Sequence, residues 1–241
     1  EIIKKEFGYD FKKFKYFAGH SLGEYSALAC VGSISFEDTL KILQKRGKFM
    51  QEAVPSGEGA MLAVLGMASK ELDKILEMNN KKYKCFIAND NSNLQVVVSG
   101  LKKDINLLSD DLNNKKIKNL KLNVSAPFHC KYMKTASEKM TSYINDLNMN
   151  DLEKPIISNV TANETSSSRE IKSLLISQIE KKVRWLESVE YMINNGVKNF
   201  VEIGPGKVLS GLIKRINKNV IVNSINSEED IKLLTNDWSK K

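Results

Sequence analysis

Five residues near the start of the chain form a motif that suits a nucleophilic serine. The segment Gly19-His20-Ser21-Leu22-Gly23 follows a short aromatic stretch and precedes a helical run. In such a G-x-S-x-G pattern, the serine occupies a sharp strand-to-helix turn, where the helix N-terminus stabilises negative charge on oxygen. We expect both glycines to let the chain fold back without a Cβ clash. The alternative is an ordinary glycine turn, because five residues alone are not specific.

A serine nucleophile needs a general base, and the chain has only two histidines. His20 directly precedes Ser21, so the two side chains diverge in a sharp turn, and we expect His20 to brace the loop. His129 lies in a proline-containing loop after a predicted strand, where catalytic residues of α/β proteins are often found. By elimination, His129 is the candidate base. Its alternative is a surface histidine without a catalytic role.

Arginine is rare in this chain, with 4 Arg against 33 Lys. Arg46 lies on a predicted helix near the serine, and a guanidinium binds a carboxylate through two parallel hydrogen bonds. The alternative is a helix-surface arginine, which is the default for the other three. Gln178 and Asn159 are polar residues near apolar segments, and most such residues are hydrogen-bonded structural groups.

Composition excludes several classes of protein. The 241 residues carry a net charge of +8 and are 41% hydrophobic and 27% charged, which is typical of a globular chain. No apolar run approaches the roughly 18 residues of a membrane helix, and no arginine cluster interleaved with aromatics indicates nucleic-acid binding. Cys30, Cys85 and Cys130 are widely spaced, so we expect no metal site and a reducing compartment. A basic surface would attract anionic partners instead.

The elements that must position these residues alternate between strand and helix. We expect a strand at 14–18, a helix at 24–30 and a second helix that Ser35 caps and that ends before Pro55. The next part has the order β-α-β-β-α-β, which is the split βαβ of a ferredoxin-like unit. Its expected elements are a strand at 60–65, a helix at 69–78 capped by Ser69, strands at 83–88 and 95–99 around a turn at 89–93, a helix at 102–112 and a strand at 117–124.

The rest of the chain returns to alternating strands and helices. We expect helices at 132–147, 171–179, 183–194 and 208–216, and strands at 155–160, 200–203 and 220–224. This alternation predicts a mostly parallel sheet covered on both faces. The chain is therefore predicted to be an α/β protein into which the smaller unit is inserted.

The motifs together resemble the malonyl-CoA:acyl carrier protein transacylase family of type II fatty acid synthesis. Four segments keep the family's order and approximate spacing over the whole chain: 19–28, 46–53, 183–185 and 202–209. The resemblance implies an α/β-hydrolase-like larger subdomain, residues 1–58 and 125–241, with an inserted ferredoxin-like subdomain, residues 59–124. It also implies an [acyl-carrier-protein] S-malonyltransferase, which moves malonyl from malonyl-CoA to the phosphopantetheine thiol of acyl carrier protein through a malonyl-serine intermediate.

The resemblance gives each candidate residue a role. Ser21 would be the acylated nucleophile, with His129 as its base, and Arg46 would hold the malonyl carboxylate. The Leu22 backbone N–H would form half of the oxyanion hole, and the Gln178 carbonyl would orient the histidine in place of a triad aspartate. No cofactor is implied, because coenzyme A thioester and carrier phosphopantetheine are substrates.

Two further positions and one missing segment bear on this resemblance. Phe128 resembles malonyl-selective members, in which bulk before the histidine disfavours a 2-methyl group. Lys182 stands where the family usually has proline, which affects a turn. The family begins with a strand and a Gly-Gln-Gly-Ser-Gln loop that supplies the second oxyanion donor. This segment is missing before Glu1, so we expect the 241 residues alone to be weakly active or inactive.

Two alternatives to the transferase stay open. One is a serine thioesterase or esterase on the same scaffold, although hydrolases run in the order Ser, Asp/Glu, His, and no acidic residue is obviously placed for His129. The other is a non-catalytic fragment that docks a carrier protein.

The partners and the compartment follow from the transferase interpretation. We expect malonyl-CoA and acyl carrier protein as partners, and a monomer that lies in the cytoplasm if the protein is bacterial, or in a plastid-like organelle if it is eukaryotic.

Overall fold

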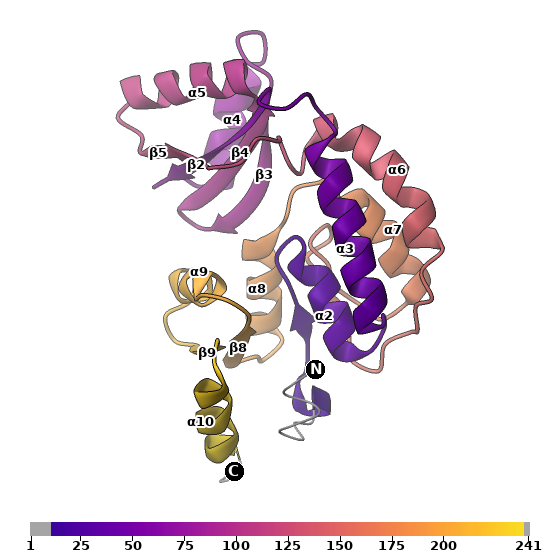
Figure 1. Ribbon diagram of the computed structural model, residues 1–241. Coiled ribbons are helices and arrows are strands. Elements are labelled where there is room, and N and C mark those ends of the chain that lie inside the picture. Colours follow the sequence, from indigo (N-terminus) through magenta and orange to yellow (C-terminus); the bar gives the residue numbers. More distant parts are fainter. Residues whose placement is uncertain (1–10, 239–241) are drawn as a thin grey trace.

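The computed structural model describes residues 11–238 and has two parts (Figure 1). A small sheet with two helices lies at the top of Figure 1, and a larger α/β part lies below it. Both ends of the described chain belong to the larger part, so the small unit is one continuous segment between α3 and α6. We propose residues 59–124 as the extent of this insertion. The ends of the predicted larger subdomain, 1–10 and 239–241, lie outside the described residues.

The small unit is a four-stranded antiparallel sheet with the strand order β3-β4-β2-β5. Its elements are β2 (Gly59–Leu65), α4 (Ser69–Met78), β3 (Cys85–Ser92), β4 (Gln95–Leu101), α5 (Lys102–Asn114) and β5 (Asn119–Lys121). Because side chains alternate along a strand, Leu62 and Val64 face the two helices, whereas Met61 and Ala63 face the other side. The predicted β-α-β-β-α-β order is confirmed.

Two details of this unit differ from the sequence prediction. The expected turn at 89–93 is wrong, because β3 continues to Ser92 and pairs with β4 through two irregularities of register. Such bulges keep polar residues in a strand that the sequence reads as a loop. The N-cap of α4 is Ala68, which has extended backbone angles, so Ser69 is the first helical residue and not the cap.

The larger part holds two small sheets. In the first, β1 (Phe17–Ala18) pairs parallel with β6 (Ile156–Ile157), which pairs antiparallel with β7 (Glu164–Thr165). In the second, β8 (Asn199–Ile203) pairs parallel with β9 (Ile221–Ile225). The described strands of the larger part are therefore mostly parallel, as expected, but they form two sheets and not one. β6 ends at Ile157 because the chain turns back at once, with Ser158 N bonded to Asn163 O.

Helices cover these short strands. They are α2 (Gly23–Val31), α3 (Phe36–Gln51), α6 (Lys134–Asn145), α7 (Ser168–Gln178), α8 (Trp185–Asn194), α9 (Val208–Ile216) and α10 (Glu228–Trp238), with short 3-10 turns at Phe11–Lys13 and Lys131–Met133. Neither α10 nor β7 is expected from the sequence. As predicted, Ser35 caps α3, and its Oγ accepts from Asp38 N at 3.0 Å. None of the described helices is long and apolar enough to cross a membrane.

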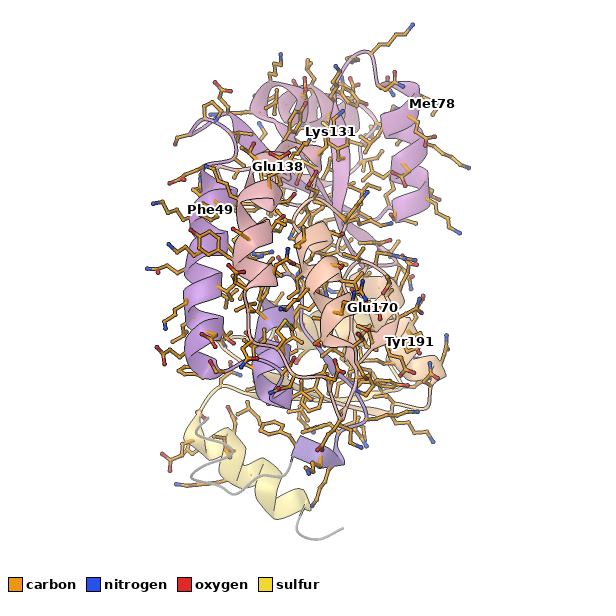
Figure 2. The ribbon with its side chains drawn as sticks, turned by 90° about the vertical axis from the view of Figure 1, so that its right-hand side faces the viewer. Phe49, Met78, Lys131, Glu138, Glu170 and Tyr191 are labelled. Atoms are coloured by element: carbon orange, nitrogen blue, oxygen red, sulfur yellow. The ribbon has the colours of Figure 1, made fainter. Side chains whose placement is uncertain are left out.

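The core that supports the serine turn is formed by helices α2, α3, α6 and α7. Tyr25 and Leu28 of α2 are fully buried in it, together with Met133 and Met140. Figure 2 shows α3, which carries Phe49, beside α6, which carries Glu138. Burial of this apolar face fixes where α2 begins, and therefore where the turn before it lies.

Candidate active site

Ser21 lies at the sharp turn between β1 and α2. Its φ is 55°, in the left-handed region that residues with a Cβ rarely adopt. The side chain of Asn159 holds this turn from both sides: its Oδ1 accepts from Ser21 N at 2.7 Å, and its Nδ2 donates to Gly19 O at 2.8 Å. The buried side-chain amide of Asn159, which follows β6, thus holds Ser21 in this strained conformation.

The two glycines of the motif play different parts. A Cβ on Gly19 would lie 1.9 Å from the carbonyl oxygen of Gly23, so glycine is required there. A Cβ on Gly23 would meet no atom of the described residues within 4 Å. The expectation that both glycines avoid a clash is therefore correct for Gly19 and wrong for Gly23, which is the first residue of α2.

His129 is brought to Ser21 from the loop before the 3-10 turn at Lys131–Met133. Its Nε2 lies 2.7 Å from Ser21 Oγ, and its Nδ1 lies 2.9 Å from the backbone oxygen of Gln178. The carbonyl can only accept, so Nδ1 carries the proton and Nε2 is free to accept the serine proton. Burial and the Arg46 charge lower the pKa of His129 to about 3, so the imidazole is neutral.

Arg46 on α3 contacts the same serine. Its Nη2 donates to Ser21 Oγ at 3.1 Å and to Gln178 Oε1 at 3.0 Å, and its side chain is buried. The guanidinium carbon lies 5.7 Å from the centre of the Tyr25 ring. Within residues 11–238, the buried Nε–H of Arg46 has no hydrogen-bond acceptor. A buried guanidinium with an unused donor beside a nucleophile suits a substrate that carries a carboxylate near its reactive carbonyl.

Gln178 connects these groups, and a buried glutamate completes the network. Gln178 Nε2 donates to Glu24 Oε2 at 2.6 Å and to Ser21 O at 3.0 Å. Glu24 Oε2 also accepts from Asn159 N at 3.2 Å. Burial raises the pKa of Glu24 to about 7, although its hydrogen bonds and the Arg46 charge act in the opposite direction.

Sequence reasoning missed Glu24 and treated Asn159 as a structural polar residue. Helical spacing carried a signal for Glu24, since it shares one face of α2 with the buried Ala27 and Leu28. Nothing in the sequence distinguishes Asn159, because it acts across 138 positions on Ser21.

The remaining candidates lie around this network. Leu22 is the residue before α2; its side chain is half exposed, and its N–H has no acceptor in the described part of the chain. Phe128 is half-buried and packs against the core formed by α2, α3, α6 and α7 and against the sheet of the small unit. His20 braces the turn as expected, with Nε2 2.8 Å from Asn91 Oδ1 and its ring 5.6 Å from that of Trp185.

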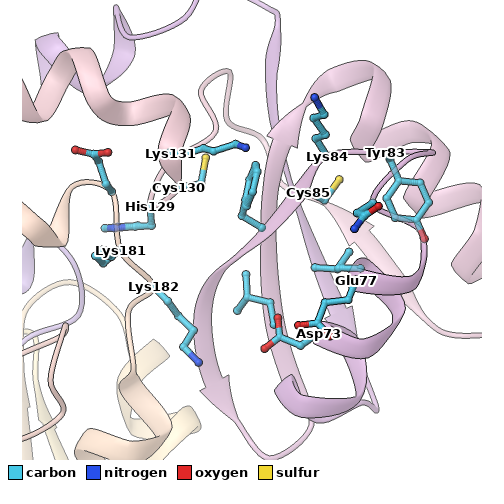
Figure 3. Close-up of a pocket in the computed structure, with 15 residues that line it drawn as sticks. Asp73, Glu77, Tyr83, Lys84, Cys85, His129, Cys130, Lys131, Lys181 and Lys182 are labelled. Carbon is cyan, nitrogen blue, oxygen red and sulfur yellow. The ribbon is translucent and has the colours of Figure 1, made fainter.

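A cavity of about 690 Å³ lies between α4 and β3 of the small unit and segments 129–131 and 180–182. Figure 3 shows His129 and Lys182 on one side of it and Asp73 and Glu77 on the other. Ser21 does not line this cavity. The cavity borders the candidate base without containing the candidate nucleophile.

Known proteins are similar to this chain in sequence and in fold. A sequence model of the acyl transferase domain family matches residues 12–228. The malonyl CoA-acyl carrier protein transacylase of Bacillus subtilis is 43% identical over 221 residues, which cover 90% of this chain and 69% of that protein. A transacylase of the same name from Staphylococcus aureus strain MRSA252 is 44% identical over 218 residues, 89% of this chain and 70% of that protein.

Solved structures of malonyltransferases also superpose on this chain. The acyl-carrier-protein-S-malonyltransferase of Bartonella henselae superposes with a TM-score of 0.94 at 38% identity, covering 98% of this chain and 76% of that one. A malonyl-transacylase in complex with a type II polyketide synthase acyl-carrier protein gives a TM-score of 0.92 at 34% identity, covering 98% and 76%. The chain therefore belongs to the malonyl CoA-acyl carrier protein transacylase family.

Proposed function

We propose that this chain moves malonyl from malonyl-CoA to the phosphopantetheine thiol of an acyl carrier protein, through a malonyl ester of Ser21. The observation that carries the proposal is that the Ser21 hydroxyl contacts both a neutral histidine, at 2.7 Å, and a buried arginine, at 3.1 Å. The first contact suits nucleophilic attack, and the second suits an acyl group with a free carboxylate. The relatives' names and the carrier-protein complex support the same pair of substrates.

In the first half-reaction, Ser21 gives its proton to His129 Nε2 and attacks the thioester carbonyl. The new Oγ–C bond forms a tetrahedral intermediate, whose oxyanion the Leu22 N–H stabilises. The carbon–sulfur bond then breaks, and His129 returns the proton to the departing thiolate of coenzyme A. Arg46 holds the malonyl carboxylate throughout, and Gln178 O keeps the imidazole in the required tautomer.

The second half-reaction repeats these steps with a new nucleophile. The carrier thiol gives its proton to His129 and attacks the malonyl ester, and the proton returns to Ser21 as the ester bond breaks. No cofactor takes part, since both thioesters are substrates. The half-buried Phe128 would limit the space near the acyl group and so disfavour a 2-methyl substituent.

A serine hydrolase on the same scaffold is the alternative in the enzyme class. His129 Nδ1 bonds to a backbone carbonyl and not to a carboxylate, which is unlike the triad of such hydrolases. A buried Arg46 also suits an acyl acid better than a neutral ester. The alternative from another class, a non-catalytic docking fragment, gives no reason for the Ser21–His129 contact.

One experiment separates these functions. The protein is incubated with radiolabelled malonyl-CoA and no carrier protein. We expect label to accumulate on Ser21, to be absent from Ser21→Ala and to persist in Cys130→Ala, a control thiol beside His129. Continuous release of free malonate would favour a hydrolase, and no label on any residue would favour a docking fragment.

The partners, the oligomeric state and the compartment are proposed on the same basis. The partners are malonyl-CoA and an acyl carrier protein, with no nucleic acid, and the net charge of +8 suits an acidic carrier. We propose a monomer, in the cytoplasm of a bacterium or a plastid-like organelle of a eukaryote, that supplies malonyl units for fatty acid elongation.

A further inference from the structure

Glu24 is a buried carboxylate to which the reaction above gives no part. It lies in the first turn of α2, and its side chain is 1% exposed. Its Oε2 accepts from Gln178 Nε2 at 2.6 Å and from Asn159 N at 3.2 Å. Burial of a charge is costly unless the charge is paired and hydrogen-bonded, so a carboxylate kept at this position needs an explanation.

A carboxylate determines the orientation of the amide that faces it. An ionised carboxylate only accepts hydrogen bonds, so Glu24 requires the NH₂ end of the Gln178 amide. The other end, Oε1, then faces Arg46 and accepts from its Nη2 at 3.0 Å. If the amide were reversed, its NH₂ would face the guanidinium, and two donors would oppose each other.

Arg46 is therefore held by a chain of contacts that begins at Glu24. The same Nη2 that donates to Gln178 also donates to Ser21 Oγ at 3.1 Å. We propose that Glu24 is a positioning residue for the acyl carboxylate: it fixes the Gln178 amide, which holds the Arg46 guanidinium beside Ser21. This inference rests on the proposed function, in which Arg46 binds the malonyl carboxylate.

The charged and titratable groups around Glu24 come from several elements. Arg46 faces it from α3, Tyr25 adjoins it on α2, and His129 and His20 flank Ser21 from their loops. Burial raises the pKa of Glu24 to about 7, whereas the pKa of His129 is lowered to about 3. A change in activity near neutral pH thus reports on Glu24 separately from the base.

The variant Glu24→Gln keeps the size of the side chain but can both donate and accept. The charge-assisted bond from Gln178 Nε2 is then replaced by a weaker neutral one, and only Ser21 O still requires the NH₂ end of the amide, so Gln178 holds Arg46 less firmly. The measured quantity is the ratio of the rates at which malonyl-CoA and acetyl-CoA acylate Ser21. We expect this ratio to fall about tenfold at about pH 8, the loss expected from one charge-assisted hydrogen bond. Asp104→Asn, which neutralises a buried carboxylate on α5, is the matched control and should keep the ratio.

The sign of the change distinguishes positioning from charge alone. Removal of a negative charge would by itself strengthen the attraction of Arg46 for a second carboxylate and raise the ratio. A ratio that rises or stays constant in Glu24→Gln therefore overturns the proposal. In a folded variant, an equal fall in both rates would leave the ratio unchanged, which overturns it as well.

The pH profile of the unmodified protein gives a second readout. We expect its malonyl-to-acetyl ratio to fall as the pH drops through about 7, and Glu24→Gln to remain at the low-pH level throughout. Should the variant fail to fold, this profile decides alone, and a ratio that is constant from about pH 5.5 to about pH 8.5 overturns the proposal. If the unmodified protein accepts no malonyl on Ser21, the proposed function fails too, whereas labelled Ser21 with an unchanged ratio overturns only the role of Glu24.

Discussion

The Nη2 of Arg46 lies 3.1 Å from the Oγ of Ser21, so a buried positive charge contacts the oxygen that His129 also contacts. This arrangement joins two requirements of a malonyl transferase in one place. The oxygen that attacks the thioester and the group that recognises the carboxylate are neighbours, as the short malonyl chain demands.

The arginine is expected to select the acyl group. We predict that Arg46→Lys lowers acylation of Ser21 by malonyl-CoA about 10²-fold, because an ammonium cannot form two parallel bonds to a carboxylate. Acylation by acetyl-CoA should change by only a few-fold. Stopped reactions with each labelled thioester measure both rates, and Arg169→Lys, at an exposed position on α7, is the control. An equal loss for both substrates would contradict a role in carboxylate recognition.

The histidine should stay neutral throughout the physiological pH range. Because burial and Arg46 lower the pKa of His129 to about 3, we predict no titration of its ring between about pH 5 and about pH 8 by NMR. Arg46→Met removes the charge and should raise the pKa of His129 toward its ordinary value. The chain has only two histidines, so His20→Gln assigns the signals. A His129 ring that titrates near its ordinary value in the unmodified protein would contradict this electrostatic account.

The two motif glycines should respond differently to alanine. Gly19→Ala places a Cβ 1.9 Å from the Gly23 carbonyl oxygen, so we predict a loss of about 3 kcal/mol or more in the free energy of unfolding. Gly23→Ala meets no described atom and lies in the first turn of α2, so its stability should change by about 1 kcal/mol at most. Urea denaturation of both variants checks this, and equal destabilisation would contradict the geometry of the turn.

The buried Glu24 should leave a signature in the pH dependence of stability. Its pKa is raised from 4.5 to about 7 on folding, so the folded chain binds the proton more tightly than the unfolded one. The stability linked to Glu24 is thus fully present below about pH 4.5 and is lost as the pH rises through about 7. We predict that the unfolding free energy of the unmodified protein, minus that of Glu24→Gln, falls by about 3 kcal/mol across this range.

Denaturation at a series of pH values measures this difference. The same subtraction for Asp104→Asn provides the control for a buried carboxylate remote from the site. A difference that stays level or increases with pH would show that folding does not raise the pKa of Glu24.

Local patterns were enough to predict the small unit and the elements that carry Ser21 and Arg46. The helix α3 has a capping serine and a clear apolar face, and the glycines around Ser21 indicate a turn. The two-residue strands β1 and β6 were predicted too long, because the sequence cannot show that Ser158 ends β6 with a backbone turn. Local signals also cannot reveal a bulge that extends β3 to Ser92.

Site contacts across the chain were the hardest to predict. His129 and Arg46 were found because both residue types are rare, and the resemblance gave Gln178 its role. Asn159 and Glu24 belong to residue types that are common in the chain, and their importance comes only from burial beside Ser21. A buried hydrogen-bond network is a property of tertiary packing, which no single segment encodes.

The central claim is that Ser21 carries a malonyl group that only a carrier thiol removes. The most direct measurement is the intact mass of the protein with malonyl-CoA, then after addition of acyl carrier protein with or without its phosphopantetheine. We predict a stable malonyl adduct on Ser21 that the carrier with phosphopantetheine removes and the carrier without it leaves in place. An adduct lost to water at the same rate in both cases, or an adduct that survives in Ser21→Ala, would contradict the account.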